Sequence, residues 1–138
     1  MQEPEIAFSR WTRWTERTSL KGIRAPGVYL LAHFDVVPAG PANPRAEQII
    51  YIGETCKNSL MGRWRQFNRS AFGGKSGHSG GETYRQVFDR QADNLCVAAF
   101  PVEGLDEGIG SLFIRYVERK LIWEFAREWD TAPRCNRR

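Results

Sequence analysis

The sequence predicts an α/β (α+β) fold in which a small three-stranded antiparallel sheet is flanked by helices. Two segments rich in β-branched and aromatic residues, 27–34 and 49–55, are separated by a proline-rich stretch and predict a long hairpin. A third apolar segment, 95–103, predicts the last strand. Apolar residues at helical spacing after the second and third strands predict the helices that cover the sheet. A hairpin followed by helices, another strand and a final helix is typical of an α+β domain.

Length and composition indicate a globular chain. Its 138 residues contain no internal repeat and no linker, so we expect a single domain over residues 1–138. Apolar residues make up 41%, which is too high for a disordered chain. The three cysteines show no CxxC spacing and neither histidine lies in ligand register with them, which excludes a disulfide framework and a zinc motif. Because no signal peptide or membrane-length segment is evident, we expect a soluble, cytoplasmic protein.

The first half of the chain reads as a helix followed by two strands. Residues 8–20 predict a short helix with Phe, Trp and Trp as its apolar contacts, ended by Gly22 and closed off by Pro26. The segment GVYLLAHF (27–34) predicts a strand because it is rich in β-branched and aromatic residues. The segment IIYIGET (49–55) predicts the second strand of the hairpin.

The second half alternates between helices, a glycine-rich loop and the last strand. Either Asn58 or Ser59 can cap a helix whose core side carries Leu, Trp and Phe. The segment GGKSGHSGG (73–81) predicts an irregular loop, and a further helix is expected from Glu82. Residues 109–129 then predict a long amphipathic helix, after which the chain ends in an extended segment.

Glu118 is an acid in an unexpected place on this last helix. It falls within the apolar stripe formed by Ile114, Leu121, Ile122, Phe125 and Trp129. A carboxylate on a buried surface loses hydration unless a cation, a metal or hydrogen bonds replace the water. Glu118 is therefore expected to face a positive group. The alternative is a Glu at the rim of the helix that reaches solvent or pairs with Arg115 or Arg119.

A block of positive charge lies in the middle of the chain. Residues 57–90 hold seven cations and two anions, a local excess of +5, although the whole chain carries only +4. The cations of this block are Lys57, Arg63, Arg65, Arg69, Lys75, Arg85 and Arg90. We expect Lys57, Arg65, Arg69 and Lys75 to contact the phosphates of a nucleic acid, with an ordinary solvated face as the alternative.

Five short motifs occur in a fixed order along the chain. They are GVY at 27–29, YIG at 51–53, LMGRW at 60–64, YVERKLIWEFA at 116–126 and CN at 135–136. The order and the expected elements resemble the GIY-YIG nuclease superfamily, most closely its homing and restriction-type members. The resemblance implies a GIY-YIG-like fold and a phosphodiesterase. No one of these motifs is specific by itself, whereas five motifs in this order, each on the expected element, make coincidence improbable.

The resemblance also implies roles for the matching residues. Either Tyr29 or Tyr51 is the general base, with the other tyrosine positioning water. Arg63 holds the non-bridging phosphate oxygens, which suits a planar donor fork that stays charged. Glu118 binds one divalent cation, Mg²⁺ or Mn²⁺ in its place, with water and phosphate completing the ligands. This cation is the positive partner that the apolar stripe requires.

Two further residues match the family pattern less firmly. His78 lies in the loop after the arginine helix, where it either assists the tyrosine or the attacking water, or contacts DNA phosphate. Asn136 resembles the late asparagine that helps to orient the site. The sequence departs from the pattern in a hairpin tip lengthened by AGPANPR (39–45) and in Glu54, which stands where repair nucleases of the superfamily have lysine.

These observations predict a metal-dependent DNA endonuclease in which water attacks directly, leaving a 5′-phosphate and a 3′-hydroxyl. One site cuts one strand, so cleavage of both strands needs a homodimer or two successive events, and target choice needs loops or a specificity partner protein. Three alternatives stay open. The chain is a non-catalytic nucleic-acid-binding module, a nuclease for RNA or branched DNA, or a protein whose basic block binds another polyanion.

Overall fold

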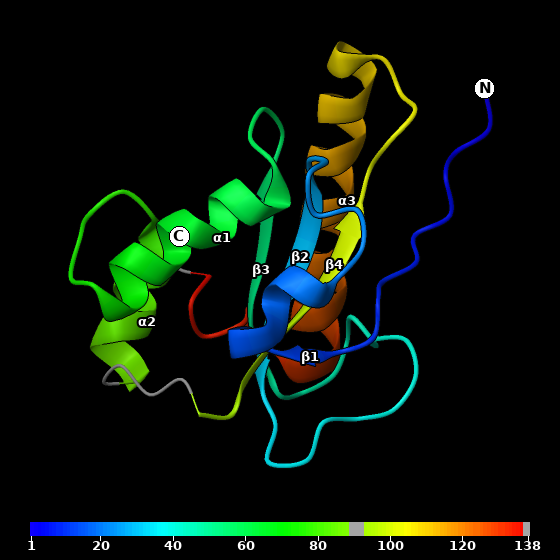
Figure 1. Cartoon of the computed structure of the whole chain (residues 1–138). Coiled ribbons are helices and arrows are strands. Elements are labelled where there is room, and N and C mark those ends of the chain that lie inside the picture. Colours follow the sequence, from blue (N-terminus) through cyan, green and yellow to red (C-terminus); the bar gives the residue numbers. More distant parts are fainter. Residues whose placement is uncertain (89–92, 137–138) are drawn as a thin grey trace.

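The computed structural model describes residues 1–88 and 93–136 and shows a mixed α/β fold with a four-stranded antiparallel sheet. The strand order is β1-β4-β2-β3. Figure 1 shows α1 and α2 on one side of this sheet and α3 on the other. The elements are β1 (Thr12–Arg13), the 3-10 helix η1 (Trp14–Ser19), β2 (Gly27–His33), β3 (Ile49–Thr55), α1 (Leu60–Phe72), α2 (Ser79–Phe88), β4 (Leu95–Pro101) and α3 (Glu107–Trp129).

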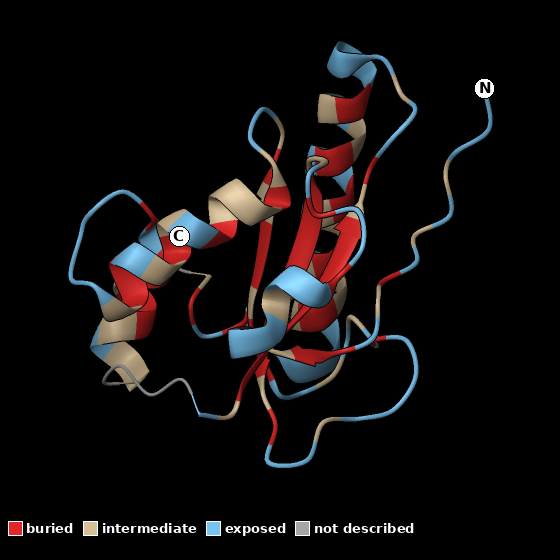
Figure 2. Cartoon of the chain, in the orientation of Figure 1, coloured by how far each residue is buried: buried red, intermediate tan, exposed pale blue. Residues whose placement is uncertain are grey.

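The central strand β2 separates two hydrophobic clusters. Val28, Leu30 and Ala32 face the cluster that contains the buried side of α3. Tyr29 and Leu31 face the cluster formed with η1, α1 and α2. This alternation is the period of two that a strand buried on both faces requires. Figure 2 shows the strands of the sheet mostly buried, between helices whose exposed residues face outward.

The pairing of β2 with β3 sets the positions of both motif tyrosines. Tyr29 lies opposite Gly53, and Leu31 lies opposite Tyr51. The register shifts after Leu31, so that Ile50 is an extra residue in β3. Tyr29 and Tyr51 therefore lie on the same face, because paired positions in an antiparallel sheet share a face. The predicted hairpin and the shared face of the tyrosines are confirmed.

The helix predicted over residues 8–20 is wrong. Thr12 and Arg13 form a short strand that pairs with β4, and only residues 14–19 are helical, with 3-10 geometry. Trp11 packs in the cluster on the α3 side, whereas Trp14 packs in the cluster on the α1 side. Trp11 and Trp14 are spaced as on one face of a helix, but they belong to a segment that crosses the edge of the sheet and lie on opposite faces of it. This extra strand also makes the sheet four-stranded, where three strands were predicted.

Two helix starts differ from the sequence analysis. The helix α2 begins at Ser79, so the irregular loop is shorter than the predicted 73–81. The helix α3 begins at Glu107, after the cap residue Asp106. The cap of α1 is settled, because Ser59 Oγ accepts a hydrogen bond from the Gly62 N–H. Among the described residues, no helix has the length and apolar character needed to span a membrane.

Candidate active site

Tyr29 lies fully buried in the middle of β2, beside the half-buried Tyr51. The two ring centroids are 6.0 Å apart. The glycine of the YIG motif makes this arrangement possible. A Cβ atom on Gly53 would lie 2.5 Å from Tyr29 Cζ and 2.5 Å from Tyr51 Cε2, which is closer than carbon atoms approach. Gly53 is thus required by the two tyrosines that pack over it.

His78 forms a hydrogen bond with Tyr29, and its direction follows from the second ring nitrogen. The Gly81 N–H donates to His78 Nδ1 at 3.1 Å, so this nitrogen is unprotonated. The proton of the neutral ring is on Nε2, which therefore donates to Tyr29 Oη over 2.9 Å. Burial, and then the nearby Arg63 guanidinium, lower the pKa of His78 from 6.5 to about 3. His78 is neutral at physiological pH.

Tyr29 keeps its own proton in this environment. Burial and then the neighbouring Tyr51 raise the pKa of Tyr29 well above 10.0. The charge of Arg63 and a hydrogen bond from it act in the opposite direction. Tyr29 is therefore a neutral phenol at neutral pH, and its Oη accepts hydrogen bonds from His78 and from Arg63.

Arg63 lies at the border of the buried side of α1. Leu60 and Phe67, one turn before and one turn after it, are both buried, whereas Arg63 itself is half-buried. Its Nη1 donates to Gln66 Oε1 at 2.6 Å. This bond fixes one side of the planar guanidinium and leaves other donors for a ligand. Gln66 was not among the predicted site residues, although its spacing of three residues from Arg63 on a helix was a usable signal.

The helix α2 approaches Tyr51 through a glycine. A Cβ atom on Gly80 would lie 2.6 Å from Tyr51 Cε1 and 3.1 Å from His78 Cε1. The ring centroids of Tyr51 and His78 are 5.7 Å apart. The glycine-rich sequence after His78 therefore lets the start of α2 pack closely against Tyr51 and His78. Only an irregular loop was predicted there. Tyr29, Tyr51, Arg63 and His78 come together on the α1 and α2 side of the sheet.

Glu118 is half-buried on α3, between buried residues on the same helix. Ile114 and Leu121, one turn to either side, are buried in the cluster beneath the sheet, as is Phe125. The predicted stripe is therefore confirmed for most of its members. It is wrong for Trp129, which is 36% exposed and whose Nε1 donates to the Arg45 carbonyl at 2.8 Å.

The position of α3 brings Glu118 to the side of the sheet opposite α1. Most contacts of α3 with the sheet are made with β3, which is an edge strand. Side chains from α1 and from α3, which lie on opposite faces of the sheet, can both reach one ligand only around the edge formed by β3. In the described part of the chain, no three His, Cys, Asp or Glu side chains come together to hold a metal. A single carboxylate still suits Mg²⁺, which keeps several waters and takes phosphate oxygens as ligands.

Asn136 forms hydrogen bonds with the outer edge of β3, within the YIG motif. Its Oδ1 accepts from the Ile52 N–H at 2.9 Å, and its Nδ2 donates to the Ile52 carbonyl at 2.9 Å. Ile52 stands between Tyr51 and Gly53 in the YIG motif. The Cys135 N–H donates to the Ile50 carbonyl at 2.8 Å, which adds a backbone contact along the same edge. Asn136 thus holds the strand that presents Tyr51.

The four predicted phosphate contacts are all exposed. Lys57 lies in the turn before α1, Arg65 and Arg69 lie one turn apart on the outer side of α1, and Lys75 lies in the loop before α2. Arg90, the last cation of the basic block, lies outside the described residues. The exposed cations lie around the helix that carries Arg63 and the loop that carries His78.

Comparisons of the chain with protein-family models, with curated proteins and with solved structures found no match. The family resemblance therefore depends on the five motifs and on the arrangement of their residues.

Proposed function

We propose that the protein is a metal-dependent DNA endonuclease of the GIY-YIG type. The observation that carries this proposal is the position of Tyr29, which accepts a hydrogen bond from a neutral His78 while Arg63 lies beside it. A phenol buried between an imidazole and a guanidinium has no obvious packing advantage over phenylalanine, because each buried polar group must be hydrogen-bonded to offset lost hydration. A tyrosine is more useful than phenylalanine at this position if the site must orient a phosphate and a water.

The residues on the α1 side divide the chemistry between them. Arg63 holds non-bridging oxygens of the scissile phosphate, where negative charge grows during attack. Tyr29 is fully buried, so we assign it a positioning role. It accepts a hydrogen bond from Arg63 and keeps the guanidinium directed at the phosphate, while His78 fixes the orientation of its ring. Tyr51 is the more exposed of the two phenols and is assigned the removal of a proton from water. A phenol does this only as the phenolate, whose formation nearby positive charge favours.

Glu118 would hold the divalent cation at the β3 edge. When bound, Mg²⁺ stabilises charge on phosphate and leaving-group oxygens. Asn136 fixes the backbone of Ile52, so that the YIG segment keeps its position when substrate binds. The exposed cations around α1 and α2 would attract the DNA backbone without reading its bases. The products would be a 5′-phosphate and a 3′-hydroxyl, with one strand cut per site.

The test is cleavage of supercoiled plasmid in the presence of Mg²⁺. We compare the wild type, the wild type with EDTA, Glu118→Ala and Glu128→Ala, whose exposed carboxylate on the same helix is the matched control. Nicking that requires the metal, persists in Glu128→Ala and is lost in Glu118→Ala supports the proposal. DNA binding without cleavage in the wild type would instead favour a non-catalytic module. Parallel reactions with RNA and branched DNA assign the substrate.

A further inference from the structure

We propose that the N-terminal 3-10 helix η1 extends the nucleic-acid surface, with Arg17 binding a backbone phosphate together with Arg65 and Arg69 of α1. This inference rests on the proposed function, because it concerns the same substrate. It assigns a role to a segment that lies outside the five motifs. The ligand is the phosphodiester backbone of DNA, contacted at phosphates other than the one that is cut.

Trp14 fixes η1 against α1. Its side chain is 2% exposed, and its Nε1 donates to Asn68 Oδ1 at 2.8 Å. Its ring also packs against Phe67, with centroids 5.2 Å apart, and against Trp64, with centroids 6.2 Å apart. These contacts hold one end of η1 over the α1 turn that runs from residue 64 to residue 68. The relative position of η1 and α1 is therefore determined by a buried aromatic and a hydrogen bond.

Arg17 is held in place by the same tryptophan. Its Cζ lies 4.4 Å from the centroid of the Trp14 ring, a cation–π contact. Its Nη1 donates to the Trp14 carbonyl at 2.9 Å. A guanidinium has five N–H donors, so most of them stay available after this bond. A half-buried arginine with a fixed stem loses little conformational entropy when it binds a ligand.

Arg17 and Arg65 are close enough to repel each other. Burial, and then the charge of Arg65, lower the pKa of Arg17 from 12.5. In the described part of the chain, neither of these two guanidinium groups forms an ion pair with a carboxylate, and the neighbouring Glu16 is exposed. Two cations held side by side without an anion are unfavourable in the free protein. An anion that binds between them removes this repulsion.

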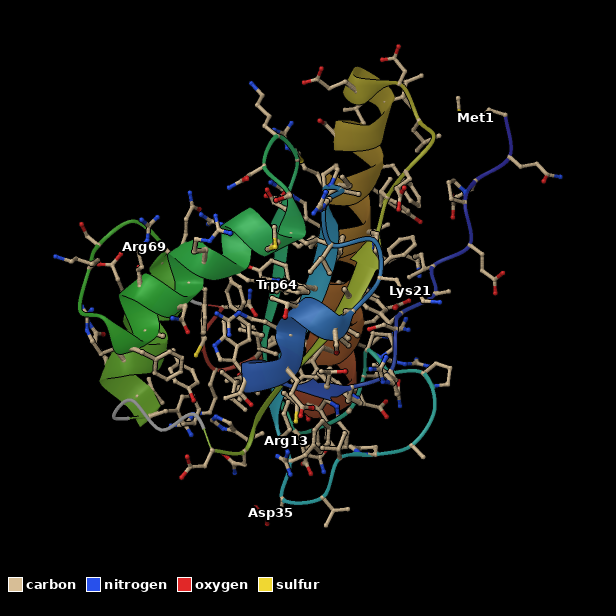
Figure 3. The ribbon with its side chains drawn as sticks, viewed as in Figure 1. Met1, Arg13, Lys21, Asp35, Trp64 and Arg69 are labelled. Atoms are coloured by element: carbon tan, nitrogen blue, oxygen red, sulfur yellow. The ribbon has the colours of Figure 1, made fainter. Side chains whose placement is uncertain are left out.

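The third cation makes the surface elongated. Arg69 follows Arg65 by four residues, so both project from the same side of α1, about 6 Å apart along the helix axis. Figure 3 shows Arg69 on the outer side of α1 and Trp64 on its inner side. The catalytic candidate Arg63 is on the same helix, two residues before Arg65. Residues two apart on a helix do not share a side, so Arg63 projects elsewhere. The row formed by Arg17, Arg65 and Arg69 suits a polymer of phosphates better than a single free phosphate.

The test is the salt dependence of DNA binding, measured with EDTA present so that cleavage does not interfere. The probe is a short fluorescent DNA duplex, titrated with wild type, Arg17→Gln, Arg65→Gln and Arg127→Gln. Arg127 is exposed on the last turn of α3 and is the matched control. Arg65→Gln changes an exposed residue, so it reports on the surface even if Arg17→Gln disturbs η1. Thermal unfolding of each variant shows whether it is folded.

Loss of one phosphate contact lowers the slope of log K against log salt by about 0.9 for duplex DNA. We expect this decrease for Arg17→Gln and for Arg65→Gln, and none for Arg127→Gln. Slopes of both variants equal to that of Arg127→Gln would overturn the inference, even if the wild type cleaves plasmid. A wild type that binds DNA with the predicted slopes but never cleaves it would support the surface and contradict the nuclease. A wild type that does not bind DNA would overturn both.

Discussion

Tyr29 Oη and His78 Nε2 are 2.9 Å apart, and the histidine is the donor in this hydrogen bond. The direction is imposed by the N-terminus of α2, where the Gly81 N–H occupies the other ring nitrogen. A histidine arranged in this way cannot take the proton of Tyr29 without first losing a bond or a proton. His78 is therefore a positioning residue, and Tyr29 is a poor general base.

Acid should destabilise the protein through His78. Its pKa is about 3 in the folded chain and near 6.5 when unfolded, so the unfolded state binds more protons between these values. Stability contributed by neutral His78 is complete above about pH 6.5 and is lost as the pH falls toward 3, with a slope of at most about 1.4 kcal/mol per pH unit. The free energy of unfolding is measured with denaturant for the wild type and for His78→Gln, at a series of pH values from neutral downward.

The control for this measurement is the second histidine. Burial, and then Arg134, also lower the pKa of His33, so that residue adds its own acid sensitivity. A His33→Gln variant should keep the His78 component of the slope. Parallel curves for wild type and His78→Gln would show that His78 does not titrate as we expect.

Substitution of Gly53 should remove activity and stability together. In Gly53→Ala the new methyl group overlaps Tyr29 and Tyr51, both 2.5 Å away, so the rings or the strand must shift at a cost of about 1–3 kcal/mol. Gly108→Ala is the control, since its nearest atom is Asp106 Oδ1 at 3.7 Å and alanine favours a helix by about 0.8–1 kcal/mol. Unfolding and plasmid cleavage are measured for both. A stable, active Gly53→Ala would show that the tyrosine packing is dispensable.

Lysine should not replace Arg63. It keeps the positive charge but loses the planar fork that bonds Gln66 and, in the proposed mechanism, would hold a phosphate at the same time. We expect the single-turnover cleavage rate to fall about 100-fold or more, by analogy with removal of one transition-state donor. Arg65→Lys, on the exposed side of the same helix, should change the rate little. Equal rates for the two variants would place Arg63 outside the site.

Asn136 should act on activity through the backbone of β3. Asn136→Ala removes both bonds to Ile52, each worth about 0.5–1.5 kcal/mol net. Asn136→Asp keeps the acceptor but sets a carboxylate oxygen against the Ile52 carbonyl, so it should be at least as harmful. Denaturant unfolding and cleavage rate are compared, with Asn43→Ala in the exposed hairpin connection as the control. A full cleavage rate in Asn136→Ala would show that this tether does not support the site.

Much of the fold follows from local patterns in the sequence. The strands β2, β3 and β4 and the helices α1 and α3 are predicted close to their observed bounds, because each has a regular period and a recognisable turn or cap. The N-terminal segment is not, since pairing of Thr12 and Arg13 with β4 is a long-range contact that local spacing does not encode. The start of α2 is missed for a similar reason. Gly80 and Gly81 disfavour a helix by propensity, and only their close packing explains them.

The candidate site shows the same division. The residue types and their order along the chain identify Tyr29, Tyr51 and Arg63, and the shared face of the tyrosines follows from strand pairing. The bond between His78 and Tyr29 spans 49 residues and depends on how α2 packs, so the sequence leaves the role of His78 open. The same holds for Arg17, which senses the charge of Arg65 because Trp14 docks η1 on α1.

The order of the strands also affects how copies of this protein behave at high concentration. One outer strand, β1, has only two residues, and the free edge of the other, β3, is met by Cys135 and Asn136. Neither edge offers a long row of unpaired backbone groups to a neighbouring sheet. Removal of the residues after Asp130 should therefore open the β3 edge and promote aggregation, seen as increased light scattering on storage. The tail that steadies the YIG strand would then also serve to keep separate molecules apart.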